Sequence, residues 1–189
     1  MDSMITIVSG LPRSGTSMMM KMLEAGGMHV VIDSVRKADE DNPLGYYEYE
    51  KVKRVKEDAS WMKDTQGKVF KMVSMLLYDL PQNTRYKVIF MQRRMNEILA
   101  SQRKMLERRG SKRADVDSEV MRSLYERHLN ELARWLSTQH NFDVLYVSYN
   151  ELVEKPLENI WKVHQFLNGR LDVVRMLSVV DKSLYRQRK

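Results

Sequence analysis

Short apolar runs rich in β-branched residues alternate along the chain with stretches whose apolar residues recur at helical spacing. The short runs predict buried strands, because strands that are covered on both faces are almost continuously apolar. These strands are expected at 4–9, 28–32, 68–73, 86–91 and 143–149. Helices are expected at 18–25, 95–106, 118–139 and 156–167, and helical spacing also occurs at Val52, Val55 and Ala59. The alternation predicts a single α/β domain over 1–189, with a mainly parallel sheet of about five strands between two helical layers.

The composition agrees with one folded domain. The chain has 189 residues, of which 43% are hydrophobic and 30% charged, a balance that excludes disorder and low-complexity architectures. Its longest apolar runs fall far short of the ~20 residues that a membrane helix needs. The absence of cysteine excludes disulfides and thiolate metal sites. With no signal-like start either, we expect a cytoplasmic protein without a membrane span.

The excess positive charge is concentrated in one segment. The formal net charge is +7, and residues 85–113 alone hold ten basic residues against Glu97 and Glu107. Such a segment can bind nucleic acid, form a solvated helix face or bind a polyanionic small molecule. The chain lacks the basic and aromatic interleaving of nucleic-acid readers, so no nucleic-acid partner is expected. Arg93 stands apart from the rest because it lies where a strand ends.

A glycine loop joins the first strand to the first helix. Gly10 and Gly15 have the spacing of a Walker A loop, but Thr16 replaces the lysine that contacts the β and γ phosphates of a nucleotide. A cation is present inside the loop instead, as Arg13. Backbone N–H groups at a helix N-terminus, neighbouring hydroxyls and a guanidinium together predict an anion site. A tight turn of purely structural origin explains the glycines but not the polar residues between them.

The loop, from Pro12 to Ser17, resembles the 5′-phosphosulfate loop of sulfotransferases that use 3′-phosphoadenosine 5′-phosphosulfate (PAPS). The resemblance extends to a later strand that ends in Arg93, with Ser101 eight residues further on, a pair that binds the 3′-phosphate in that family. It also includes a strand that ends at Tyr149, near the adenine in the family, followed by Pro156. The segment 42–48, Asn-Pro-Leu-Gly-Tyr-Tyr-Glu, is similar to that of small bacterial members.

This resemblance implies a P-loop NTPase-like fold and transfer of a sulfuryl group from PAPS to a hydroxyl or amine acceptor, without a metal. The acceptor class stays open and includes a small molecule, a carbohydrate, a lipid or a peptide. The expected donor-binding residues are Pro12, Arg13, Ser14, Gly15, Thr16, Ser17, Arg93, Ser101 and Tyr149. A kinase-like enzyme and a PAPS-binding protein without catalysis are the alternatives.

Three residues are the candidates for the chemistry. Arg13 is expected to stabilise charge on the leaving group, and Lys71 matches the lysine of the Lys-Thr-His sequence in cytosolic members. Val73 takes the place of the histidine base of that sequence and cannot accept a proton. Other members use a carboxylate after the first helix, and Glu48 is our choice, although it could equally cap a helix. The other carboxylates of that segment are Asp33, Asp39, Glu40 and Asp41, and His29 is a remote alternative.

Overall fold

A four-stranded parallel sheet forms the centre of the computed structural model, which describes residues 4–33, 45–108, 110 and 117–180. The strands follow the order β2-β1-β3-β4. Their bounds are Ile5–Gly10 for β1, Val69–Lys71 for β2, Tyr86–Gln92 for β3 and Phe142–Ser148 for β4. Val8 is paired with Lys71 on one side and with Ile89 on the other, and Ile89 is paired with Leu145. All four strands therefore end at the same edge of the sheet.

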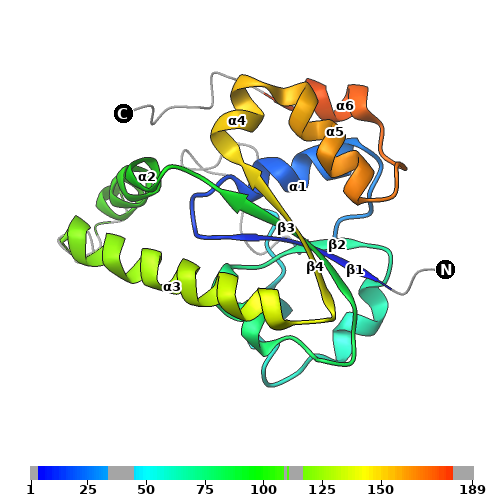
Figure 1. Cartoon of the computed structure of the whole chain (residues 1–189), viewed down its shortest axis with the longest axis horizontal. Helices are drawn as coiled ribbons and strands as arrows, with labels where there is room; N and C mark the ends of the chain where they lie inside the picture. The colour runs from blue at the N-terminus through cyan, green and yellow to red at the C-terminus, as the bar shows by residue number, and fades with distance from the viewer. Residues whose placement is uncertain (1–3, 34–44, 109, 111–116, 181–189) are drawn as a thin grey trace.

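Helices cover both faces of this sheet (Figure 1). One face carries α1 (Thr16–Ala25), α4 (Tyr149–Glu154), α5 (Pro156–Phe166) and α6 (Val173–Ser178). The other carries α3 (Ser118–Thr138) and three short 3-10 helices, η1 (Glu50–Arg54), η2 (Ser60–Thr65) and η3 (Ser74–Asp79). Helix α2 (Met95–Arg108) follows β3 and lies beside α3 beyond the end of the sheet. No helix within the described part of the chain is long and apolar enough to cross a bilayer.

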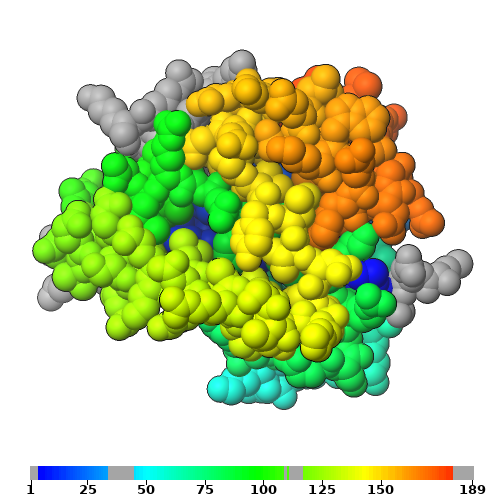
Figure 2. Space-filling view, in the orientation of Figure 1, coloured from blue at the N-terminus to red at the C-terminus, as the bar shows by residue number. Residues whose placement is uncertain are grey.

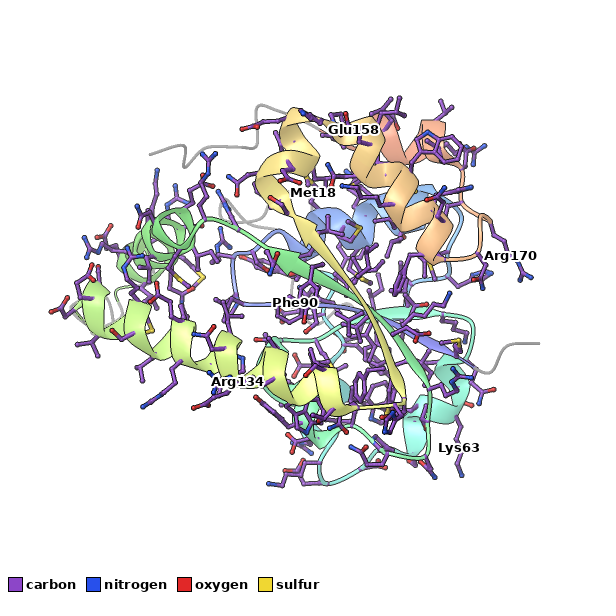
Figure 3. The ribbon with its side chains drawn as sticks, viewed as in Figure 1. Met18, Lys63, Phe90, Arg134, Glu158 and Arg170 are labelled. Atoms are coloured by element: carbon purple, nitrogen blue, oxygen red, sulfur yellow. The ribbon has the colours of Figure 1, made fainter. Side chains whose placement is uncertain are left out.

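Two apolar cores lie on opposite faces of the sheet, because alternate strand residues point to opposite sides. Val8 and Ile89 belong to the core under α1, α4 and α5, whereas Ile7 and Phe90 belong to the core under α3 and the 3-10 helices. Figure 3 shows Phe90 in the middle of the sheet and Met18 in α1. The three-layer α/β architecture with a parallel sheet is the predicted one.

The predicted strand at 28–32 is wrong, and the sheet has four strands instead of about five. This segment makes one isolated bridge, from Val30 to Val69, at the outer side of β2. The hydrogen bonds stop early because β2 is only three residues long and Asp33 N already donates to Glu48 O, 3.0 Å away. The apolar pattern was that of a strand, but the neighbouring strand offers too few backbone groups to extend the ladder.

One helical expectation also needs correction. The spacing of Val52 and Val55 corresponds to the 3-10 helix η1 and the turn after it, where both side chains are buried, and not to an α-helix. In α3, Leu132 is buried, but Val120 and Leu124 are 52% and 44% exposed. Figure 1 shows why: the N-terminal half of α3 extends beyond the sheet, so it has no strand to pack against.

Candidate functional site

The glycine loop leaves β1 and enters α1 through backbone conformations that only glycine adopts easily. Gly10 and Gly15 have φ of 149° and 100°, and a Cβ atom on Gly15 would lie 2.3 Å from Cδ2 of Tyr149. Arg13, between them, also has positive φ, at 71°. Ser14 is 1% exposed, and its hydroxyl has no hydrogen-bond partner among the residues that the structure describes. The backbone at Gly15 is closely approached by Tyr149, and the buried Ser14 hydroxyl lacks a partner within the described residues. Both features are compatible with a loop that binds an anion.

Arg13 and Ser101, which the sequence assigned to opposite ends of the donor, are in direct contact. Arg13 Nε donates to Ser101 Oγ over 2.8 Å, so the loop cation reaches across to α2. Figure 2 shows a hollow bounded by α2, α3 and β4, with the blue of the N-terminal segment visible at its floor. The loop is therefore open to solvent on this face, at the edge where the strands end.

Arg93 follows β3 and is held on several sides. Its Nε donates to Glu97 Oε2 at 2.8 Å, and its Nη1 donates to the carbonyl oxygen of Arg13 at 3.1 Å. The guanidinium lies over the ring of Tyr149, with Cζ 4.5 Å from the ring centroid, which is a cation–π geometry. Tyr149 in turn is 6% exposed and packs against Gly15. Arg93 and Tyr149 thus both support the loop that contains Arg13.

Lys71, the last residue of β2, is directed toward the start of α1. Its Nζ donates to Ser17 Oγ over 3.4 Å and also to the carbonyl oxygen of Tyr46. Ser17 Oγ donates to the same carbonyl over 3.3 Å. A loop hydroxyl, the predicted lysine and the 45–49 segment therefore meet at one point.

The segment that contains Glu48 is anchored to the rest of the molecule. The Tyr47 hydroxyl donates to Glu24 of α1, 2.5 Å away, and burial together with this carboxylate raises the pKa of Tyr47. Asp33 Oδ2 accepts from the backbone N–H of Glu50 over 2.5 Å, so Asp33 caps the 3-10 helix that follows. Glu48 is half-buried, two residues beyond the carbonyl that Lys71 contacts.

The structure gathers most of the predicted residues at the carboxyl edge of the sheet. Arg13, Ser14, Gly15, Arg93 and Tyr149 are contiguous through the contacts above, with Ser101 attached through Arg13. Residues 39–44, which include the carboxylates Asp39, Glu40 and Asp41, lie outside the described residues. Pro12 is exposed, and Thr16 is the first residue of α1.

Sequence reasoning missed two polar groups beside the site. Glu97 is 1% exposed and pairs with Arg93, and Asn150 Nδ2 donates to Glu97 Oε1 over 2.8 Å. The four-residue spacing from Arg93 to Glu97 was the available signal, because opposite charges at this spacing often pair where a helix begins. Nothing in the sequence pattern indicated Asn150, since its partner lies 53 residues away.

His128 in α3 also has a specific partner. It shares a hydrogen bond of 2.8 Å with the fully buried Ser74, and its ring packs edge-on against Tyr78. Burial lowers the pKa of His128 from its ordinary 6.5, with Glu131 opposing the shift. This pair joins α3 to η3, the 3-10 helix that follows β2.

We expect His128 to make the fold more sensitive to acid. Because its folded-state pKa is lowered, the unfolded chain binds a proton more readily, so this contribution to stability is present above about pH 6.5 and is lost as the pH falls. His128→Gln, which keeps a hydrogen-bonding side chain, should flatten the fall in the free energy of unfolding between pH 7.5 and 5.5. Urea unfolding measures this, with exposed His140→Gln as the control. Equal slopes in the His128 variant and the wild type would contradict the assignment.

Comparison with known proteins agrees with this geometry. The model of the sulfotransferase domain family matches residues 4–189. Among solved structures, the sulfotransferase domain from the curacin biosynthetic pathway is 17% identical, with a TM-score of 0.53, over 95% of this chain and 78% of that one. The sulfotransferase domain from the Synechococcus PCC 7002 olefin synthase is 16% identical, with a TM-score of 0.52, over 98% and 83% of the two chains. No curated protein sequence gives a significant match. The family match over nearly the whole chain, together with the shared fold, shows that this protein belongs to the sulfotransferase domain family.

Proposed function

We propose that the protein transfers a sulfuryl group from PAPS to a hydroxyl or amine acceptor and releases 3′-phosphoadenosine 5′-phosphate. The observation that carries this proposal is the contact of the glycine loop with both Arg93 and Ser101, which joins two cationic groups and several donors in one site. PAPS carries phosphate at both the 3′ and the 5′ position of its ribose. A site with two guanidinium groups at the end of a parallel sheet matches that charge distribution.

The donor supplies the sulfuryl group, and the chain supplies binding and orientation. The loop N–H groups with Ser14, Thr16 and Ser17 would hold the 5′ end, and Arg93 with Ser101 would hold the 3′-phosphate. The buried Ser14 hydroxyl, unsatisfied within the described residues, supports the first assignment. Tyr149 packs against the loop with its ring mostly buried, so its part in binding is to hold Gly15 and Arg93 in place.

Three groups would carry the chemistry of transfer. Arg13 lies within the loop, and Lys71 donates to Ser17 at the start of α1. Both cations would stabilise the charge that develops on the leaving oxygen and the sulfuryl oxygens. Glu48, close in sequence to the Lys71 contact at Tyr46, would take the proton of the acceptor. Asp33 is the weaker candidate for a base because its carboxylate caps a 3-10 helix.

We expect 3′-phosphoadenosine 5′-phosphate to bind at least tenfold more tightly than AMP or ADP, and to need no Mg²⁺. A tenfold ratio corresponds to ~1.4 kcal/mol, whereas one charge-assisted hydrogen bond contributes ~1.5–3 kcal/mol. Calorimetry with and without Mg²⁺ measures the ratio. Equal affinities, or binding that requires Mg²⁺, would instead favour the kinase-like alternative.

The acceptor is proposed only as a class: a small molecule, carbohydrate, lipid or peptide that offers a hydroxyl or amine. Val73, two residues after Lys71, is 42% exposed and would present an apolar side chain to it. Mass-spectrometric screening of acceptors with PAPS identifies the class. Tight donor binding with no sulfated product from any class would favour the non-catalytic alternative.

A further inference from the structure

A buried carboxylate and a buried amide lie directly behind Arg93. Glu97, 1% exposed, accepts from Arg93 Nε through Oε2 and from Asn150 Nδ2 through Oε1, both over 2.8 Å. Asn150 is 5% exposed, and its Oδ1 accepts from the backbone N–H of Arg94 over 3.2 Å. Glu97 Oε1 also lies 3.8 Å from Arg94 Nη1, so the carboxylate joins Arg93, Arg94 and Asn150.

This network joins two separate parts of the chain. Arg93 follows β3 and Glu97 lies in the first turn of α2, whereas Asn150 belongs to the first turn of α4, after β4. The two strands are adjacent and parallel, so both turns begin at the same sheet edge (Figure 1). The network is therefore well placed to fix the side chain of Arg93 relative to the glycine loop, whose Arg13 carbonyl it also contacts.

We infer that Glu97 and Asn150 are positioning residues that hold Arg93 in the orientation that recognises the 3′-phosphate, an inference that rests on the proposed function. Arg93 has a long side chain with many rotamers, and a bound anion would otherwise have to order it. Two opposing effects are at work. Glu97 offsets part of the positive charge of Arg93, which weakens anion binding, whereas its hydrogen bond pre-orders the guanidinium, which strengthens binding. We expect the pre-ordering to dominate, because the guanidinium, in a side chain only 9% exposed, contacts Tyr149 and the Arg13 carbonyl in one orientation that the Glu97 hydrogen bond fixes.

Glu97→Gln separates these effects. A glutamine oxygen can accept from Arg93 or from Asn150 but not from both, and its NH₂ group then faces another donor. We expect the affinity for 3′-phosphoadenosine 5′-phosphate to fall about tenfold while the affinity for AMP, which lacks the 3′-phosphate, changes less than about twofold. Glu97→Asp keeps the charge and both oxygens and should restore most of the ratio. Exposed Glu119→Gln is the matched control.

Calorimetric titration of each variant with the two nucleotides measures the ratio of their affinities. Thermal unfolding shows whether each variant is folded. The inference would be overturned if a folded Glu97→Gln variant kept the wild-type ratio of the two affinities. It would also be overturned if this variant bound 3′-phosphoadenosine 5′-phosphate more tightly, or lost affinity equally for both nucleotides. If Glu97→Gln does not fold, Asn150→Ala is judged by the same ratio, which should fall about threefold. A wild-type protein that does not distinguish the two nucleotides would overturn the proposed function itself, and the inference with it.

Discussion

Arg13→Ala should lower kcat at saturating PAPS by about 10²–10³, the usual effect of removing one group that stabilises developing charge. Arg13 is the cation inside the glycine loop, and its backbone is already in a left-handed conformation that aims the side chain across the site to Ser101. Because the charge on the leaving oxygen appears only during transfer, the loss should fall mainly on kcat and less on donor affinity. Steady-state kinetics with PAPS and any accepted substrate measure both.

Ser101→Ala is the matched control for this experiment. It removes the hydrogen bond from Arg13 and one proposed 3′-phosphate contact, but it leaves both guanidinium groups in place. It should therefore raise the donor KM severalfold with little change in kcat. Arg93→Ala should also chiefly weaken donor binding, but it is a less clean control because Arg93 supports the Arg13 carbonyl. Similar kcat losses in the Arg13 and Ser101 variants would show that the division of roles is wrong.

The parts of the site that are formed by residues close together in the sequence could be predicted from it. The glycine loop was predictable because a strand, a loop and a helix follow one another within about twenty residues. The turn between them needs positive φ angles, which glycine adopts easily. The places of Arg93 after β3 and of Ser101 within α2 were predictable for the same reason, because that strand and helix follow one another directly. The two apolar cores follow from alternation within each strand.

The remaining features depend on which strands are neighbours. The pairing of Glu97 with Asn150 and the contact of Arg13 with Ser101 join segments 53 and 88 residues apart, and no local pattern encodes such contacts. The same holds for the segment at 28–32, whose apolar pattern is that of a strand although β2 is too short to extend the pairing beyond one bridge. Local patterns give the elements, and the sheet order decides which polar groups meet.

Glu48→Gln should keep the fold and the donor affinity but lower kcat by about 10²–10⁴, the usual contribution of a general base. Glutamine has nearly the same shape, so the anchoring of the segment through Tyr46 and Tyr47 should persist. The loss should be largest for weakly acidic alcohols. It should shrink as the acceptor becomes more acidic, because an acceptor that ionises easily needs less help from a base. Rates measured for a series of acceptors of graded acidity test this dependence.

Asp33→Asn is the control that separates the two carboxylates. Asparagine keeps an oxygen that can accept from the backbone N–H of Glu50, so the cap should survive and turnover should change little if Glu48 is the base. Normal turnover in Glu48→Gln together with an inactive Asp33→Asn would move the assignment to Asp33. Near-normal turnover in both variants would mean that the acceptor loses its proton without either carboxylate, which leaves His29 or solvent as the proton acceptor.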